Sequence, residues 1–159
     1  MKRSLPRWSL ILFGTALAAA LSAGIALATP PSGTATAVTL ADGNTANTVN
    51  VNIDPTKLRT KDSVEVFQVS NTADPGFSSG WHSHTGPVIV NVTAGALTFH
   101  EADCTVTTVT APGAYIETTG QPILARNEGA VAAAWITTQI IPVGASHRVD
   151  VTPGLCGVS

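Results

Sequence analysis

The chain has 159 residues, of which 44% are hydrophobic and only 11% are charged. This length fits one ordinary domain, and the apolar content excludes a disordered chain. Beyond residue 28, five basic residues stand against ten acidic ones, a net charge of −5. A mildly acidic domain with scattered charge lacks the basic surface that phosphate backbones require, so the sequence argues against nucleic-acid binding.

The first 28 residues resemble an export signal. Residues 1–7 are basic, and residues 8–28 are uncharged, apolar and close on small side chains. This order is typical of a secretory signal peptide, with the mature protein beginning at Thr29. The alternative is an uncleaved membrane anchor, because 21 uncharged residues can just span a bilayer. No charged stop-transfer cluster follows, so we expect a protein that is secreted or held in the cell envelope, without stable membrane insertion once the signal is cleaved.

The two cysteines, Cys104 and Cys156, are far apart and form no CxxC redox or zinc motif. Two lone cysteines in an exported protein most often pair, because the compartment is oxidising. We therefore predict a disulfide between the middle of the domain and its C-terminal end. The alternative is a nucleophilic thiol, which requires an activating base and a reducing setting.

The mature chain is predicted to be all-β. Residues 29–48 are rich in Pro, Ser, Thr, Ala and Gly and are expected to form a flexible lead-in. The single domain then covers residues 49–159, where short apolar runs alternate with turn residues, which favours a β-sandwich or barrel. The predicted strands cover 49–53, 64–69, 88–92, 96–99, 105–110, 114–118 and 131–143.

The pair His82 and His84 is the strongest chemical signal in the sequence. Side chains at positions i and i+2 of a strand point to the same face, so two imidazoles can grip one metal ion. The alternative is a pair of histidines that hydrogen-bond locally or face solvent. The glycines around the pair help to decide between these interpretations.

Two glycine-bounded patterns carry a family resemblance. The first reads G-x5-H-x-H-x3-E-x6-G, and Gly76, His82, His84 and Gly95 fit its spacing, with Val88 in the glutamate position.

The second pattern reads G-x5-P-x-G-x2-H-x3-N. Gly113 opens it, but Gly120 falls one residue early, Thr118 replaces the proline, Ile123 replaces the histidine, and Asn127 closes it. With these two patterns the chain resembles the cupin superfamily, in particular small secreted bacterial cupins with a single domain.

The resemblance implies a cupin-type jelly-roll β-barrel, in which the glycines serve tight turns. It also implies a metal site of three histidines and one carboxylate, of which this chain supplies only His82 and His84. A homodimer is a further implication of the family. Neutral imidazoles suit Zn, Fe, Ni or Cu, and Mn also belongs among the divalent ions to consider.

Other polar side chains are candidates for the missing ligands. Glu117 lies in the predicted strand of the second motif and is the best candidate for a replacement carboxylate; alternation aims it or Tyr115 inward, but not both at neighbouring depth. Glu101 is a further candidate. His100 precedes turn residues and is expected to be exposed, and His147 is expected on the surface.

Three functional hypotheses follow. The first is an exported cupin that binds a metal ion or a small-molecule ligand through His82 and His84. The second is a metal-dependent enzyme of the dioxygenase or isomerase type, with Glu117 or substrate atoms completing the ligand set. The third is a metal-free extracellular structural or interaction module.

Overall fold

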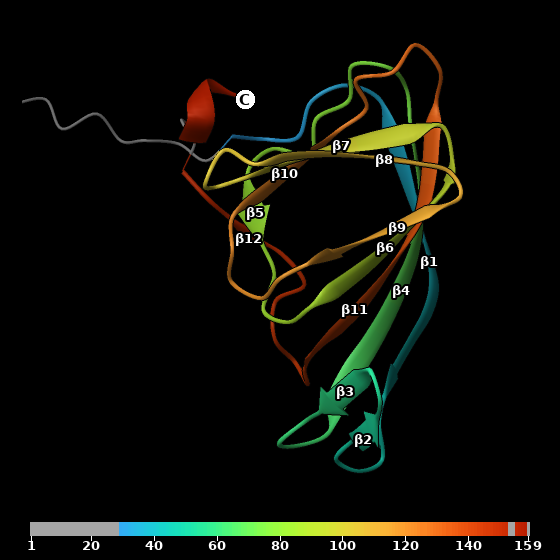
Figure 1. The fold of residues 1–159 in the computed structure, drawn as a ribbon, viewed down its shortest axis with the longest axis vertical. Coiled ribbons are helices and arrows are strands. Elements are labelled where there is room, and N and C mark those ends of the chain that lie inside the picture. Colours follow the sequence, from blue (N-terminus) through green and yellow to red (C-terminus); the bar gives the residue numbers. More distant parts are fainter. Residues whose placement is uncertain (1–28, 153–154, 159) are drawn as a thin grey trace, which may run out of the picture.

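The computed structural model describes residues 29–152 and 155–158, so the predicted signal peptide lies outside the described residues. Two five-stranded antiparallel sheets face each other (Figure 1). The first sheet contains, in spatial order, β1 (Ala35–Asn44), β4 (Val64–Ala73), β11 (Ala133–Pro142), β6 (Val88–Ala94) and β9 (Gly113–Glu117). The second contains β12 (Val149–Asp150), β5 (His82–Ser83), β10 (Ile123–Arg126), β7 (Ala96–Glu101) and β8 (Val106–Thr110).

The described part of the chain has one short 3₁₀ turn, Leu155–Gly157. None of its helical segments is long and apolar enough to cross a bilayer. The prediction of an all-β fold is therefore confirmed.

The strands predicted from alternation in the middle of the chain are confirmed as β6, β7, β8 and β9. Along β6, Val88, Val90 and Val92 are buried while the residues between them are more exposed. The stretch 131–143, which contains an alanine run, forms the long strand β11 because β-branched residues dominate its continuation. β11 pairs with β4 on one side and β6 on the other, which makes it the centre of the first sheet.

The space between the sheets holds the apolar core. Trp135 belongs to this core at 8% exposure. Trp81 is 0% exposed but lies outside that cluster, and its Nε1 donates a hydrogen bond of 2.8 Å to the carbonyl oxygen of Val158. The other large members of the core cluster are Phe77, from the segment between β4 and β5, and six residues of the two sheets: Val88, Val90, Val92, Leu97, Phe99 and Ile123.

The expected lead-in differs from the structure. Residues 35–44 form β1, which pairs with β4 from Ala35 opposite Ala73 to Asn44 opposite Glu65, with one register shift between Thr39 and Ala41. The strand was missed because both of its faces are exposed, so it lacks the apolar alternation of a half-buried strand. Backbone hydrogen bonding to β4, rather than side-chain burial, holds it in place. The β-sheet body therefore begins before residue 49.

The strand predicted at 49–53 also has a different role. It is β2 (Asn50–Ile53), which pairs only with β3 (Thr56–Arg59), and this hairpin extends away from the two sheets (Figure 1). Its apolar side chains do not face a core, and Ile53 is 69% exposed. The alternation of apolar residues identified the strand correctly. It could not show whether a second sheet packs on that strand.

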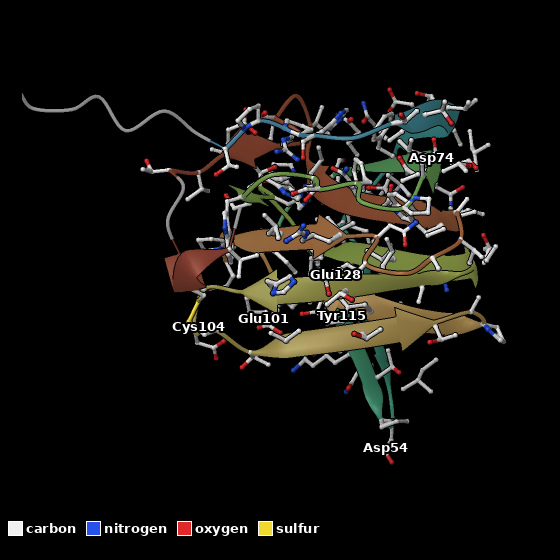
Figure 2. The ribbon with its side chains drawn as sticks, turned by 90° about the horizontal axis from the view of Figure 1, so that it is seen from above. Asp54, Asp74, Glu101, Cys104, Tyr115 and Glu128 are labelled. Atoms are coloured by element: carbon white, nitrogen blue, oxygen red, sulfur yellow. A yellow bond between two sulfur atoms is a disulfide. The ribbon has the colours of Figure 1, made fainter. Side chains whose placement is uncertain are left out.

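The predicted disulfide is confirmed. Cys104 and Cys156 are bonded, with their Cα atoms 5.4 Å apart (Figure 2). The bond joins the turn after β7 to the C-terminal 3₁₀ turn. No described cysteine is free, which removes the nucleophilic-thiol alternative.

Two glycines of the first motif occupy turns that other residues would strain. Gly76 and Gly95 have φ values of 83° and 64°, a region that side chains rarely tolerate. At Gly95 a Cβ atom would also lie 2.6 Å from the carbonyl oxygen of Ala132. Gly76 and Gly95 therefore occupy their motif positions because the turns of this fold require glycine there.

Candidate metal centre

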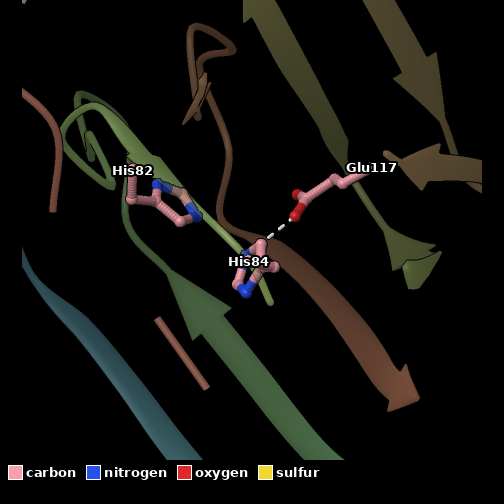
Figure 3. Close-up of side chains that lie close together, drawn as sticks. All are labelled: His82, His84 and Glu117. Atoms are coloured by element: carbon pink, nitrogen blue, oxygen red, sulfur yellow. Dashed lines mark ion pairs between the residues drawn. The ribbon is translucent and has the colours of Figure 1, made fainter. Parts of the chain in front are cut away.

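His82 and His84 both lie inside the molecule, at 5% and 8% exposure. His82 lies on the short strand β5, and His84 follows one residue after it. Their ring centroids are 4.8 Å apart and the rings are nearly perpendicular. The alternation of a strand thus brings two imidazoles into one enclosed space (Figure 3).

Backbone carbonyl groups orient both rings. Nδ1 of His82 lies 2.9 Å from the carbonyl oxygen of Gly80, and Nδ1 of His84 lies 2.5 Å from that of His147. A carbonyl oxygen only accepts, so each Nδ1 carries a proton and donates it. In the neutral rings Nε2 then holds a lone pair. Histidine ligands of metals are usually fixed in this way by a second hydrogen bond.

Glu117 enters the same space from the end of β9. It is 6% exposed, and its Oε2 lies 2.9 Å from Nε2 of His84 (Figure 3). In the pairing of β6 with β9, Glu117 is directly opposite Val88, the residue in the glutamate position of the motif. Opposite residues on paired strands point to the same face. The carboxylate that the motif lacks is therefore supplied by the neighbouring strand.

The donor set fits a cation. Oε2 of Glu117 is buried and receives no hydrogen bond from the described residues. It faces the lone pair of His84 Nε2, and two such atoms repel each other unless a proton or a metal ion lies between them. The ligand atoms of His82, His84 and Glu117 all lie within 4.8 Å of one another. A proton needs only two of these donors, whereas a metal ion can use all three.

The other sequence candidates are placed elsewhere. His100 was expected in an exposed turn, but it is 8% exposed and contacts Glu128 at 3.1 Å. The expectation failed because turn composition reports only local polarity, while His100 is the last buried position of β7. His147 is partly exposed and pairs with Glu65, and it contributes only its carbonyl oxygen to the site.

Tyr115 and Glu117 are two residues apart on β9 and share its inner face. They differ in surroundings: Tyr115 stacks on Phe99 with ring centroids 4.1 Å apart and donates a hydrogen bond of 2.6 Å to Glu101 (Figure 2). Burial raises the pKa of the Tyr115 hydroxyl, and the hydrogen bond to Glu101 adds to this effect. Glu101 is thus engaged by Tyr115 and is not part of the histidine cluster.

Ile123 occupies the histidine position of the second motif and is directly opposite His82 in the pairing of β10 with β5. It is 4% exposed and belongs to the apolar core. The alignment of the second motif therefore places this residue beside the histidines, although its side chain offers no ligand atom. A metal ion held here would have three protein ligands and open positions.

The cluster lines a cavity of about 240 Å³ whose wall holds further polar residues that sequence reasoning missed, among them Gln139 and Arg148. Burial, and after it the positive charge of Arg148, lower the pKa of His82 to about 4. His82 is therefore neutral near pH 7, the form that binds metal. No motif marks Gln139, on β11, or Arg148, just before β12, because the chain brings them to the cavity from positions far from the histidines in the sequence.

The topology decides the fold. Two antiparallel five-stranded sheets enclose the histidines of the first motif, and the second motif pairs with them through Ile123. The chain has a cupin fold. No family model matches the sequence, and no curated protein matches it.

Solved structures with a similar fold include cupins. A cupin superfamily protein from Desulfitobacterium hafniense is 10% identical with a TM-score of 0.49, and the match covers 68% of this chain and 78% of that one. A protein from Klebsiella pneumoniae with a double-stranded β-helix domain is 21% identical with a TM-score of 0.47, covering 67% of this chain and 87% of that one. A cupin-like protein from Thermotoga maritima is 16% identical with a TM-score of 0.49, and the match covers 55% of this chain and 65%, just under two thirds, of that protein. Likenesses at this level concern the fold and carry nothing about activity.

Proposed function

We propose that this chain is an exported cupin-fold protein that holds one divalent metal ion through His82, His84 and Glu117. The observation that carries the proposal is the buried oxygen Oε2 of Glu117, which has no hydrogen bond from the described residues and faces an imidazole nitrogen. A buried carboxylate oxygen without a hydrogen bond is costly, and a cation between it and the imidazole would satisfy both groups. Imidazole and carboxylate together suit Zn, Fe, Mn, Ni or Cu.

The metal would serve as a binding point for a small molecule inside the cavity. Three protein ligands leave coordination positions open, and such an ion polarises an oxygen atom bound to it. The protein's own contribution is to hold the imidazoles in one tautomer through the carbonyl groups of Gly80 and His147. The surrounding apolar side chains of Phe77 and Trp135 keep bulk water from the ligand atoms.

The test is elemental analysis of the exported protein, followed by titration of the metal-stripped protein with Zn²⁺. We expect one ion per chain, and we expect binding to disappear in the double variant His82→Ala/His84→Ala. The matched control is His100→Ala, because His100 is as buried as His84 and also contacts a carboxylate. Retention of Zn²⁺ by the double variant, or absence of any metal after reconstitution, contradicts the proposal and leaves the metal-free module.

A gain-of-function variant tests the same geometry. Ile123→His should tighten Zn²⁺ binding, because residue 123 lies opposite His82 on the inner face of the barrel. An unchanged affinity would mean that this position does not reach the ion.

A metal-dependent enzyme is the second candidate, and Glu117 is the observation that favours it. Two histidines and one carboxylate form the ligand set of non-haem Fe(II) oxygenases. Substrate-dependent oxygen uptake by the Fe(II)-loaded protein distinguishes this candidate from a binding protein. The variant Glu117→Ala should abolish that uptake together with Fe(II) binding.

Export is part of the proposal, and the disulfide supports it because such bonds persist in oxidising compartments. Mass spectrometry of the protein released from its producing cells should give a mature N-terminus at Thr29. An intact N-terminus in a membrane fraction would instead indicate an anchor.

A further inference from the structure

The metal ligands account for only part of the cavity wall. The wall also contains Gln139 and Arg148, an uncharged acceptor and a fixed positive charge. We propose that the cavity binds a small 2-hydroxy carboxylate, whose hydroxyl group donates to Gln139 and whose carboxylate pairs with Arg148. This inference rests on the proposed metal site, because the ion holds the ligand between these two residues.

The side chain of Gln139 has an unused hydrogen-bond acceptor. Its side chain is 7% exposed, and Oε1 is buried without a hydrogen bond from any described residue. Its neighbours on the two flanking strands are Phe67 and Val88, neither of which offers a side-chain donor. A buried amide oxygen is normally hydrogen-bonded. Since it lines the cavity, a ligand with a hydroxyl group can provide the missing donor.

The register places Gln139 at a suitable distance from the metal ligands. Gln139, Val88 and Glu117 lie in one row across β11, β6 and β9, and all three face inward. Neighbouring strands are about 4.8 Å apart, so the backbones of Gln139 and Glu117 are roughly 10 Å apart. Valine is the small residue between them. This leaves space for a few ligand atoms between the ion and the amide.

Arg148 gives the cavity its preference for an anion. Its Nη2 donates to the carbonyl oxygen of Ser79 at 2.8 Å, and its Nε donates to Asp150 at 2.6 Å. A guanidinium group has five N–H donors, so others remain for a ligand. With a divalent ion present, the single carboxylate of Glu117 leaves the cavity positive. An anionic ligand balances this charge, whereas a neutral diol does not.

Three small probes separate the two contacts. Lactate carries a carboxylate and a hydroxyl group, propionate lacks the hydroxyl, and 1,2-propanediol lacks the carboxylate. Calorimetry on the Zn²⁺-loaded exported protein should show lactate binding at least tenfold more tightly than either analogue.

Matched variants assign each contact to its residue. Gln139→Leu should lower lactate affinity about tenfold and leave propionate affinity unchanged, while the control Gln68→Leu changes neither. Gln68 is a suitable control because it lies on the outer face of the same sheet, bonded to Thr138. Arg148→Gln should weaken both acids but not the diol. Its control is Arg126→Gln, whose side chain is equally exposed at 31% and pairs with Glu128.

The outcomes separate this inference from the proposed metal site. If Zn²⁺ binds but lactate and propionate bind equally, the hydroxy-acid inference is overturned and the metal site stands. If Gln139→Leu and Gln68→Leu have equal effects on lactate, the role of Gln139 is overturned. If no Zn²⁺ binds to the wild-type protein, both proposals fall. The melting temperature of metal-free Gln139→Leu should rise, because an apolar residue of similar size replaces an unsatisfied amide, and this rise shows that the variant is folded.

Discussion

Two pairs in this molecule each join one histidine to one glutamate, but the two pairs differ in how far they are buried. His84 and Glu117 approach to 2.9 Å, with side chains 8% and 7% exposed. His100 and Glu128 approach to 3.1 Å, but the Glu128 side chain is 41% exposed. In the first pair both side chains are buried. In the second pair the carboxylate of Glu128 is exposed to solvent.

The difference shows what turns such a pair into a site. His100 and Glu128 form a hydrogen bond that satisfies both groups. Glu117 keeps an oxygen without a hydrogen bond from the described residues, and a second imidazole, His82, completes a group of three. A satisfied pair at the surface contributes to the fold, whereas an enclosed and unsatisfied pair with a third donor is suited to a cation.

The largest expected effect breaks the enclosed pair. Glu117→Gln should lower Zn²⁺ affinity about 1,000-fold or more, because it removes a charged ligand, and even residues that only support ligands change metal affinity 10–100-fold. Glu128→Gln is the control and should leave the affinity unchanged. Titration of both metal-stripped variants measures the difference, and equal losses would remove the distinction between the two pairs.

The third donor, His82, can be tested by measuring the stability of the protein as the pH is lowered. The pKa of His82 is lowered to about 4 in the folded protein, against 6.5 as its ordinary value. As the pH falls below 6.5, the unfolded chain therefore takes up a proton that the folded protein refuses, and stability is lost until about pH 4. A shift of this size corresponds to roughly 3 kcal/mol. Urea unfolding of the metal-free protein between pH 7 and pH 4 should show this loss, and His82→Gln should lose less by about that amount.

A smaller effect should follow from moving the carboxylate. Val88 and Glu117 are opposite each other and face the same side, so Val88→Glu combined with Glu117→Val returns the carboxylate to the motif position. The double variant should bind Zn²⁺ about tenfold to 100-fold more tightly than Glu117→Val alone. The control pairs Glu117→Val with Ile89→Glu, because Ile89 lies opposite the 60% exposed Ile116 on the outer face. If both double variants regain Zn²⁺ affinity, the carboxylate does not need to lie on the inner face of the sheet.

The fold and the histidine pair were predictable because their signals are local. Alternation, glycine turns and the spacing of His82 and His84 depend on residues close in the sequence, and the predicted export suggested the disulfide. Glu117 was identified as a candidate only, since its contact with His84 depends on how β9 pairs with β6 and on how β5 sits against them. No local pattern reports that register.

The same reason explains the failures. Gln139 and Arg148 reach the cavity through strands far along the chain, and His100 is buried by packing that turn composition does not describe. The strand β1 was missed because its ten residues are exposed on both faces. Predictions from sequence succeeded for the strands with clear apolar alternation, and they failed at the edge strand β1, at the short buried strand β10 and at contacts between distant strands.

The smallest expected effect concerns the pair of His100 and the solvent-exposed Glu128. Because water reaches Glu128, its contact with His100 is screened, and Glu128→Gln should change the free energy of unfolding by less than about 1 kcal/mol. Arg126, whose Nε lies 3.8 Å from Glu128, would lose a weak contact of the same kind. Urea unfolding at low and high salt should give the smaller difference at high salt, because exposed charges are screened there. A loss well above 1 kcal/mol that salt does not reduce would show that Glu128 is needed to bury His100, and the two pairs would then be less different than their exposures indicate.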